Sequence, residues 1–254
     1  MQSVGEVMSI GRTFRESLQK AFRSLEVGLD GLEPKPAAAG DPDVSRARSL
    51  DMSTLRYATS FRLLKIRQAF LEGQSIEDIF NVTKIDPWFL QQIKMLVDQQ
   101  NSSSLRELKH DGFSDKQIGR MLDKSELAIR EERKKDAVFP AYKVVDTCAA
   151  EFVAQTPYCY STYDEENEIE PLEGKKVMIL GGGPNRIGQG IEFDYCCCQA
   201  SYSLKEAGYE TIMINCNPET VSTDYDTSDR LYFEPLIEEY VHNIILKEKS
   251  KGNL

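Results

Sequence analysis

Apolar residues recur at intervals of three or four through the first part of the chain, a spacing that predicts helices with one buried side. Residues 1–32 are predicted to be helical from Val4, Val7, Met8, Leu18, Phe22 and Leu25, with Gly28 and Gly31 as stop signals. Residues 33–57 show no period and hold Pro34, Pro36, Gly40 and Pro42, so we expect a linker there.

Residues 58–140 are predicted to be entirely helical. One run places Leu64, Ile66 and Phe70 on a single side and ends at Gly73. Further helix starts are marked by Ser75 with Asp78, by Asp86-Pro87, and by Gly112-Phe113-Ser114. Serine and aspartate cap helix N-termini, and proline suits the first helical position.

A weak internal repeat lies within this helical stretch. The series Gly73-Gln74-Ser75, Ile79 and Leu90 resembles the later series Gly112-Phe113-Ser114, Ile118 and Ile129. Two small helix–turn–helix units would produce this pattern, although two copies are too few for a solenoid.

The pattern changes in the last third of the chain. Residues 141–173 are predicted to be an aromatic connector that ends in a solvated acidic loop from Asp164 to Glu170. From Lys175, a short apolar run, three glycines, a helical stretch over 187–207 and a second apolar run over 211–215 follow one another. This order of strand, glycine loop, helix and strand is the opening of a doubly wound α/β sheet.

Composition narrows the class of protein. The chain has 254 residues, 41% of them hydrophobic, and a formal net charge of -10, which is typical of a soluble globular protein and unfavourable for wrapping nucleic acid. No apolar run has the length of a membrane span, and no secretory signal is visible. The six cysteines lack C-x-x-C spacing, so we expect buried thiols in a reducing compartment.

The glycine-rich loop carries the sharpest local signal, formed by Gly181, Gly182, Gly183, Asn185 and Gly188. A dinucleotide fingerprint fails here because Arg186 stands where its third glycine should be, and Pro184 removes an amide donor. The phosphate-loop pattern fails because Gln189-Gly190 replaces lysine and serine or threonine. We expect a structural turn that brings Arg186 and Gln189 toward a small polar ligand.

A second polar segment, residues 215–226, follows the second predicted strand at the same sheet edge. It is either a binding loop or a plain turn, since asparagine, proline and aspartate all favour turns. His110 and His242 lack acidic or thiol partners at ligand spacing. The sequence therefore predicts no catalytic residue and no metal site.

Two long runs resemble a known family. Residues 180–196 (LGGGPNRIGQGIEFDYC) and 215–235 (beginning NCNPETVSTDYD) are similar to the start of the second synthetase half in large subunits of carbamoyl phosphate synthetases. Residues 3–21 resemble the end of the first ATP-grasp unit in that family. Residues 85–90 (IDPWFL) and 145–152 (VDTCAAEF) resemble its helical oligomerisation domain.

The resemblance implies an α + α/β chain, in which an all-helical oligomerisation-type domain precedes the first β-α-β of a Rossmann-like pre-ATP-grasp domain. Residues 1–32 would be the C-terminal end of the first ATP-grasp unit, and 33–57 a linker. Residues 58–173 would form the oligomerisation domain with its connector, and 174–254 a truncated pre-ATP-grasp domain. With only two strands and an open edge, the last 80 or so residues are expected to be marginally stable.

The resemblance also implies a function for the parent enzyme, the glutamine-hydrolysing synthesis of carbamoyl phosphate from bicarbonate, ammonia and two ATP. Ammonia would come from a glutaminase small subunit, and carbamate would move through an internal tunnel. By resemblance, that tunnel or its adjoining pocket involves Glu6, Arg186, Gly190, Glu192 and Glu219.

In the family, ATP, Mg²⁺ or Mn²⁺, and K⁺ bind in ATP-grasp domains outside residues 1–254. We therefore expect no cofactor in this chain and no activity from it alone. The parent would serve arginine or pyrimidine biosynthesis in the cytoplasm, or in an organelle of a eukaryote, and would self-associate through the helical domain.

Two other functions compete. Residues 112–135, with Ile118, Leu122 and Ile129 as a core, have the shape of a nucleic-acid-binding helix–turn–helix, but their charges nearly balance. A small NAD-binding protein is the second alternative, which Pro184 and Arg186 oppose.

Overall fold

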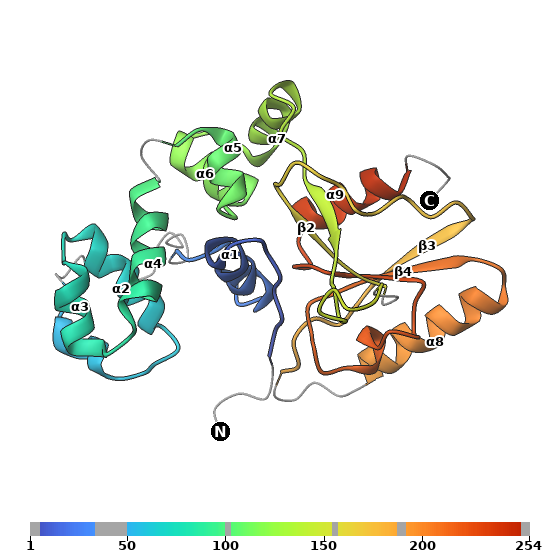
Figure 1. The fold of residues 1–254 in the computed structure, drawn as a ribbon, viewed down its shortest axis with the longest axis horizontal. Helices are drawn as coiled ribbons and strands as arrows, with labels where there is room; N and C mark the ends of the chain where they lie inside the picture. Colours follow the sequence, from blue (N-terminus) through green and yellow to red (C-terminus); the bar gives the residue numbers. More distant parts are fainter. Residues whose placement is uncertain (1–5, 34–49, 100–102, 154–156, 187–191, 250–254) are drawn as a thin grey trace, which may run out of the picture.

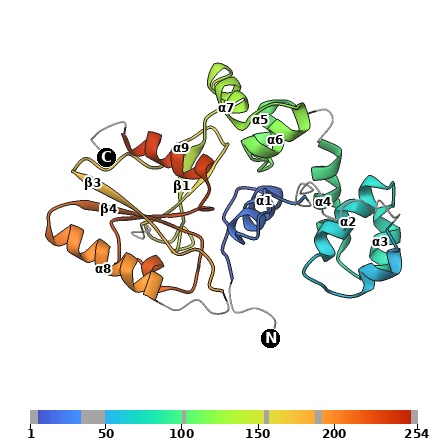
Figure 2. The same ribbon diagram turned by 180° about the vertical axis from the view of Figure 1, so that it is seen from behind.

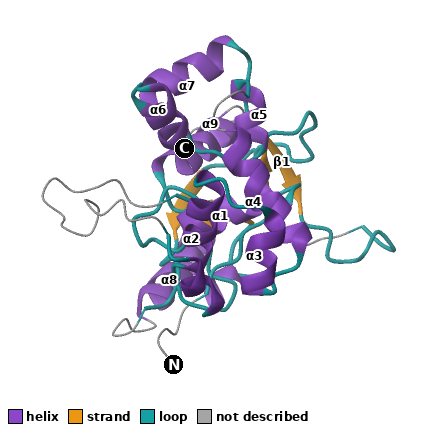
Figure 3. Ribbon diagram, turned by 90° about the vertical axis from the view of Figure 1, so that its left-hand side faces the viewer, coloured by secondary structure: helices purple, strands orange, loops and turns teal. Residues whose placement is uncertain are grey.

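The computed structural model describes residues 6–33, 50–99, 103–153, 157–186 and 192–249. A group of helices lies on one side of the molecule and a sheet with helices on both faces lies on the other (Figures 1 and 2). Helix α1 (Phe14–Ser24) lies between them. Figure 3 views the molecule from the helical side.

The helical part agrees closely with the prediction for residues 58–140. Its helices are α2 (Arg62–Leu71), α3 (Ile76–Thr83), α4 (Pro87–Gln99), α5 (Leu105–His110), α6 (Asp115–Leu122) and α7 (Glu126–Lys135). Ser75 and Ser114 cap α3 and α6, and each forms a reciprocal capping box with the third helical residue. Both predicted start signals, and Pro87 at the first position of α4, are confirmed.

The internal repeat is also confirmed, with every equivalent position 39 residues apart by the numbering. Helices α3 and α6 both end at a residue in the left-handed region, Lys84 at φ 58° and Asp123 at φ 53°. The repeated positions Ile79, Leu90, Ile118 and Ile129 are fully buried, whereas Leu122, which was also expected in the core of the second unit, is 49% exposed. The four buried residues belong to one apolar core shared by α1 to α7.

The prediction of a helix over 1–32 is wrong for much of its length. Thr13 caps α1, and residues 6–13 are not helical. Instead, the Met8 amide donates a hydrogen bond to the Cys216 carbonyl (2.8 Å), and Met8 and Ile10 pack against the sheet. Met8 and Ile10 lie two positions apart, which is the spacing of an extended segment with one side against a sheet and not that of a helix.

The predicted linker is only partly described, because residues 34–49 lie outside the described ranges. Where the chain is described again, Met52–Arg56 form a 3-10 helix. Leu55 is fully buried in the helical core, so the end of this segment is packed structure.

The sheet has five strands in the order β1-β2-β5-β4-β3. The strands are β1 (Ala141–Val144), β2 (Tyr158–Thr162), β3 (Lys176–Leu180), β4 (Glu210–Asn215) and β5 (Arg230–Phe233). Strands β2, β5, β4 and β3 run parallel, and β1 pairs antiparallel with β2. The β3–β4 register joins Lys176 to Glu210 and Leu180 to Ile214.

The expectation that the sheet contains only two strands is therefore wrong. The prediction that residues 141–173 are only a connector is wrong as well. Residues 141–162 supply β1 and β2, which lie in the same sheet as β3 to β5. The aromatic residues that indicated a connector are strand residues, and Tyr142 packs edge-on against Tyr232 of β5. The sheet crosses the expected domain boundary at 173/174, while β3 does form an edge of the sheet.

Helices cover both faces of the sheet (Figure 1). One face packs Ile212, Ile214 and Tyr232 against α9 (Glu238–Lys249). The other packs Met213 and Leu231 against α8 (Glu192–Glu206) and the segment that includes Met8. Consecutive residues of β4 point to opposite faces, as strand geometry requires.

The cysteine prediction is confirmed in part. All six thiols are free; Cys159, Cys198 and Cys216 are buried, whereas Cys196 is exposed. Burial raises the pKa of Cys216 to about 12, so its thiol stays protonated at neutral pH.

Candidate functional site

Buried charges join the helical part to the sheet, and they set the position of the segment before α1. Lys20 of α1 is 1% exposed. Its ammonium donates to the Ile10 carbonyl (2.9 Å), the Ser161 carbonyl (2.6 Å) and Glu234 Oε1 (3.2 Å). A single side chain therefore ties α1 to its own leading segment, to β2 and to the end of β5.

A second group of buried charges lies where α5, α6 and α7 meet α9. Lys109 Nζ lies 2.5 Å from Glu239 Oε1 and 3.1 Å from Asp115 Oδ1, and Arg133 donates to both Asp115 oxygens. Burial acts to raise the pKa of Asp115, but Lys109 and Arg133 outweigh it and hold that pKa below its ordinary value.

Arg23 of α1 completes the junction. Its guanidinium donates to the Gly112 carbonyl (2.7 Å) and to the Tyr240 hydroxyl of α9 (2.8 Å). Because an unpaired buried charge is costly, these contacts favour one relative placement of α1, the helical core and the sheet.

The buried charges of the junction place the segment before α1 at the carboxyl end of β4. With Met8 hydrogen-bonded to Cys216, the segment before α1 runs beside the loop that follows β4. Glu6 and Glu219 come together there, and the negative charge of Glu219, together with a hydrogen bond that protonated Glu6 donates to it, raises the pKa of Glu6. Both residues are exposed. The neighbouring charge of Glu219 makes ionisation of Glu6 less favourable, which is the cause of its raised pKa.

The glycine turn after β3 lies against the same loop. The Gly181 amide donates to the Ile214 carbonyl (2.8 Å), and the Gly183 amide donates to Asn215 Oδ1 (3.2 Å). In return, Asn217 donates to the Gly183 carbonyl (3.2 Å). Two amides of the loop are thus engaged within the protein instead of facing an anion.

Glycine is required at both ends of this turn. A Cβ at position 181 would lie 2.5 Å from the Asn215 side chain. Gly183 has φ +68°, and a Cβ there would lie 2.5 Å from Glu26 Oε1. The glycines therefore permit close packing against Asn215 and Glu26, in agreement with the expected structural turn.

Arg186 reaches across to the end of α1. Its guanidinium forms an ion pair with Glu26, in which the two side chains are 51% and 26% exposed. Glu26 itself has φ 52°, in the left-handed region. The ion pair holds Arg186 at the junction between the glycine turn and the end of α1.

The structure thus brings three predicted site residues, Glu6, Glu219 and Arg186, to the carboxyl edge of the sheet. Gly182 and the exposed Asn185 lie in the described part of the turn. Gly188, Gln189 and Gly190 lie outside the described residues, as does the side chain of Glu192, whose backbone begins α8.

Sequence reasoning missed several polar residues of this region. Glu26 gave no signal because its partner is 160 positions away. Asn215 and Asn217 were visible only as turn formers, although their side chains bind the glycine loop. Lys20 gave no signal in the sequence, whereas the structure buries it among polar groups.

The described residues give little support for a metal or a membrane span. Among them, no group of three or more histidine, cysteine, aspartate or glutamate side chains could hold a metal ion. No helix in these described ranges has the length and apolar character needed to cross a membrane. His110 is near Asp111, with Nδ1 3.6 Å from Oδ1.

Two family models match the chain in succession. Residues 6–137 match the oligomerisation domain of the carbamoyl-phosphate synthetase large chain. Residues 173–254 match the carbamoyl phosphate synthase preATP-grasp domain. Strands β1 and β2 lie between the two matches.

Curated relatives resemble almost the whole chain. It is 54% identical to the carbamoyl phosphate synthase large chain of Pseudomonas syringae pv. tomato, with 99% of this chain and 24% of the relative covered. The same protein of Archaeoglobus fulgidus is 51% identical, with 99% and 24% covered. For Nostoc sp. the identity is 53%, with 99% and 23% covered. The chain therefore spans about a quarter of the length of the relatives it matches.

Proposed function

The chain belongs to the family of carbamoyl phosphate synthase large chains, and from that membership we propose that it supplies two parts of such an enzyme. One part is a surface for self-association in the helical region. The other is a section of the wall past which carbamate travels. Synthesis of carbamoyl phosphate from bicarbonate, ammonia and two ATP is a property we propose for the complete enzyme.

The convergence of Glu6, Glu219 and Arg186 at one sheet edge is the observation that carries the wall proposal. Carbamate is a small anion that water decomposes. The Arg186 guanidinium attracts such an anion. The raised pKa of Glu6 means that its carboxyl ionises less readily than an ordinary glutamate, which weakens its repulsion of the same anion.

The described residues do not fit the ATP and metal chemistry of the complete enzyme. The amides of Gly181 and Gly183 are engaged, and among the described residues no group of three or more histidine, cysteine, aspartate or glutamate side chains could hold a metal ion. No step of the reaction is therefore assigned to this chain. Phosphoryl transfer would take place elsewhere in the complete large chain.

Partners follow from the same membership. The matched oligomerisation domain supports self-association through the helical region. A glutaminase small subunit would deliver ammonia to the complete enzyme. We also propose a cytoplasmic location, supported by the six free cysteines, and a role in arginine or pyrimidine biosynthesis.

Three of the four basic residues of α7 are engaged in ion pairs, which opposes the nucleic-acid alternative. Arg133 is bound to Asp115, Arg130 to Glu126 and Glu238, and Lys134 to Glu131. Engaged in this way, these charges contribute little to phosphate binding. The NAD alternative is opposed by the engaged amides of the glycine turn.

A hybrid enzyme tests the wall proposal. This segment replaces its counterpart in the Pseudomonas aeruginosa large chain, to which it is 53% identical. We expect Glu219→Gln to raise the ATP hydrolysed per carbamoyl phosphate formed, because carbamate is lost before its second phosphorylation. Glu151→Gln, an exposed position in the loop after β1, is the matched control. If the Glu219 variant hydrolyses the same amount of ATP per carbamoyl phosphate as the unmodified hybrid, the proposed role of Glu219 in the carbamate wall is contradicted.

A further inference from the structure

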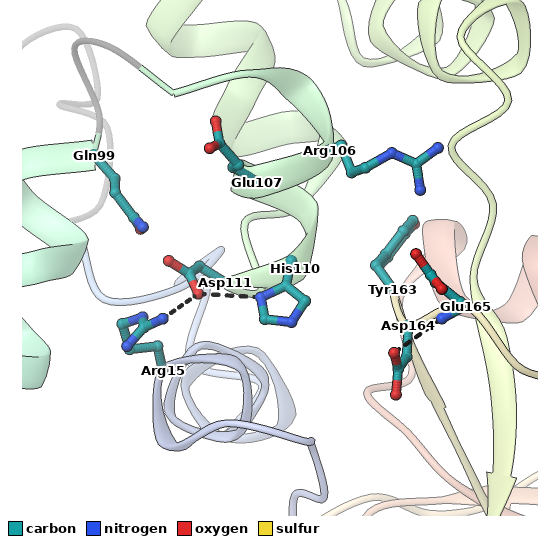
Figure 4. A pocket seen from close by; sticks show the side chains of 9 residues that line it. All are labelled: Arg15, Gln99, Arg106, Glu107, His110, Asp111, Tyr163, Asp164 and Glu165. Atoms are coloured by element: carbon teal, nitrogen blue, oxygen red, sulfur yellow. Dashed lines mark hydrogen bonds and ion pairs between the residues drawn. The ribbon is translucent and has the colours of Figure 1, made fainter.

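A cavity separate from the sheet edge lies where α1, the end of α4, α5 and the loop after β2 meet. Its volume is about 390 Å³, within the range of small-molecule sites. Figure 4 shows the side chains that line it. The glycine turn and the Glu6–Glu219 pair do not line this cavity.

Buried acceptors without hydrogen-bond donors gather around this cavity. The Asp111 side chain is 2% exposed, and neither of its carboxylate oxygens accepts a hydrogen bond. Arg15 Nη2 lies 2.8 Å from Oδ1 as an ion pair, which leaves Oδ2 without a donor. Gln99 Oε1 is also buried without a donor. Unsatisfied acceptors of this kind are costly unless another molecule donates to them.

The charge of the lining favours a cation. Four carboxylates line the cavity, those of Glu107, Asp111, Asp164 and Glu165, against the two guanidinium groups of Arg15 and Arg106. With His110 counted as uncharged, four carboxylates and two guanidinium groups give the lining itself a formal net charge of -2, and Asp164 is in addition paired with Arg12 (3.6 Å) and Lys143 (3.9 Å) from outside the lining. The Arg15 guanidinium is in addition shared with Gln92, whose Oε1 it reaches at 2.7 Å.

The acids occupy opposite sides of the cavity. Figure 4 shows Asp111 with Arg15 and Gln99 toward one side, Asp164 and Glu165 toward the other, and His110 between them. A linear molecule with a positive group at each end would present one charge to each side. No set of metal ligands occurs in the described residues, so the matching cation is organic.

We propose that this cavity binds an aliphatic diamine in its doubly protonated form. One ammonium donates to Asp111 Oδ2 and Gln99 Oε1, and the other lies between the carboxylates of Asp164 and Glu165. The methylene chain passes His110. Each ammonium has three donors, so the orphaned acceptors are satisfied without moving Arg15.

Isothermal titration calorimetry of the chain with 1,4-diaminobutane tests the proposal. Butylamine and 1,4-butanediol serve as the probes with one charge and with none. We expect the diamine to bind at least about tenfold more tightly than butylamine, because a charge-assisted hydrogen bond contributes roughly that much. Equal affinity for the diol, or no binding of the diamine, would overturn the assignment.

Variants locate the binding within the chain. Asp111→Asn should weaken diamine binding at least about tenfold, whereas Asp98→Asn, an exposed position on α4, should leave it unchanged. Glu165→Gln changes only an exposed carboxylate and should weaken the diamine but leave butylamine unaffected. If thermal unfolding shows that the Asp111 variant is not folded, the Glu165 variant decides. Identical affinities of Glu165→Gln and the native chain for the diamine would contradict the proposal.

Discussion

The apolar core of the helical part and the charged junction beside it are built on different principles. In the core, Ile79 and Ile118 occupy equivalent positions and are fully buried among aliphatic side chains. In the junction, Lys20, Lys109 and Asp115 are equally buried, yet each contacts charged or polar groups. Burial alone therefore does not distinguish the two regions; only the partners do.

The difference lies in how each region responds to a lost side chain. An apolar core loses packing in proportion to the volume removed, and neighbouring atoms relax partly into the gap. A buried ion pair leaves an uncompensated charge when one partner is removed. The junction is thus the more specific region, because it tolerates only one relative position of α1 and the sheet.

The largest effect is expected from Lys109→Met. The substitution leaves Glu239 and Asp115 buried with less compensating charge, so the free energy of unfolding should fall by about 3–5 kcal/mol. Urea unfolding followed by circular dichroism measures it. Lys116→Met is the matched control, since Lys116 is an exposed lysine with one ion pair, and it should cost less than about 1 kcal/mol. Equal effects of the two variants would mean that the junction is not stabilised by its charges.

Truncation of the repeated core positions comes next. Ile79→Ala and Ile118→Ala should each lower the free energy of unfolding by ~3 kcal/mol, because each leaves a cavity in a closely packed core. Since the two positions are structurally equivalent, their effects should be similar in urea unfolding. A cost near zero at one of them would show that the two units are not packed alike.

Acid unfolding separates two carboxyls of the junction. The pKa of Asp115 is lowered in the folded chain, so its stabilisation is present above its unfolded value of 3.8 and is lost as pH falls through the folded value. Burial raises the pKa of Glu234, and the charge of Lys20 opposes this effect only in part. The pH dependence of the stability contributed by Glu234 therefore has the opposite sign, and this stability is lost as pH rises through the pKa that Glu234 has in the folded chain.

Unfolding free energies measured across acidic pH show the two signs. Each group changes the slope by at most ~1.4 kcal/mol per pH unit. Asp115→Asn should reduce the loss of stability that occurs as pH falls below 3.8, the pKa of the unfolded aspartate. Glu234→Gln should reduce the loss of stability that occurs as pH rises above 4.5, the pKa of the unfolded glutamate. The same slope change in both variants would contradict the assigned signs.

The smallest effects are expected at the helix caps. Ser75→Ala and Ser114→Ala each remove an acceptor for an amide at a helix start and should cost ~1 kcal/mol. Ser114 is 1% exposed and Ser75 is exposed, so water can replace the lost partner only at position 75. Thermal unfolding should therefore show the larger decrease for Ser114→Ala; the reverse order would count against burial as the cause.

The predictable parts of the fold are those with local causes. Caps such as Ser75, the proline at α4, and the repeated Ile79 and Ile118 could all be found because neighbours in sequence determine them. The strand–glycine loop–helix–strand order was found in the same way, from the run that became β3 and the glycines after it.

The parts that were missed depend on distant partners. Strands β1 and β2 were not predicted, because their structure depends on the pairing of β1 with β2 and of β2 with the distant β5, whereas local aromatic content does not determine it. Lys20 and Glu26 were missed because their partners, Glu234 and Arg186, lie more than a hundred positions away. For the candidate site, the family resemblance indicated Glu6, Glu219 and Arg186, while their physical convergence required the structure.

The meeting of Glu6 with Glu219 depends on the junction, since Lys20 holds the segment that leads to α1 through the Ile10 carbonyl. A carbon-detected NMR titration of the Glu6 carboxyl tests this directly. The account predicts a pKa above the ordinary value of 4.5 in the native chain and a return toward that value in Glu219→Gln. An ordinary pKa of Glu6 that does not respond to the substitution would contradict it.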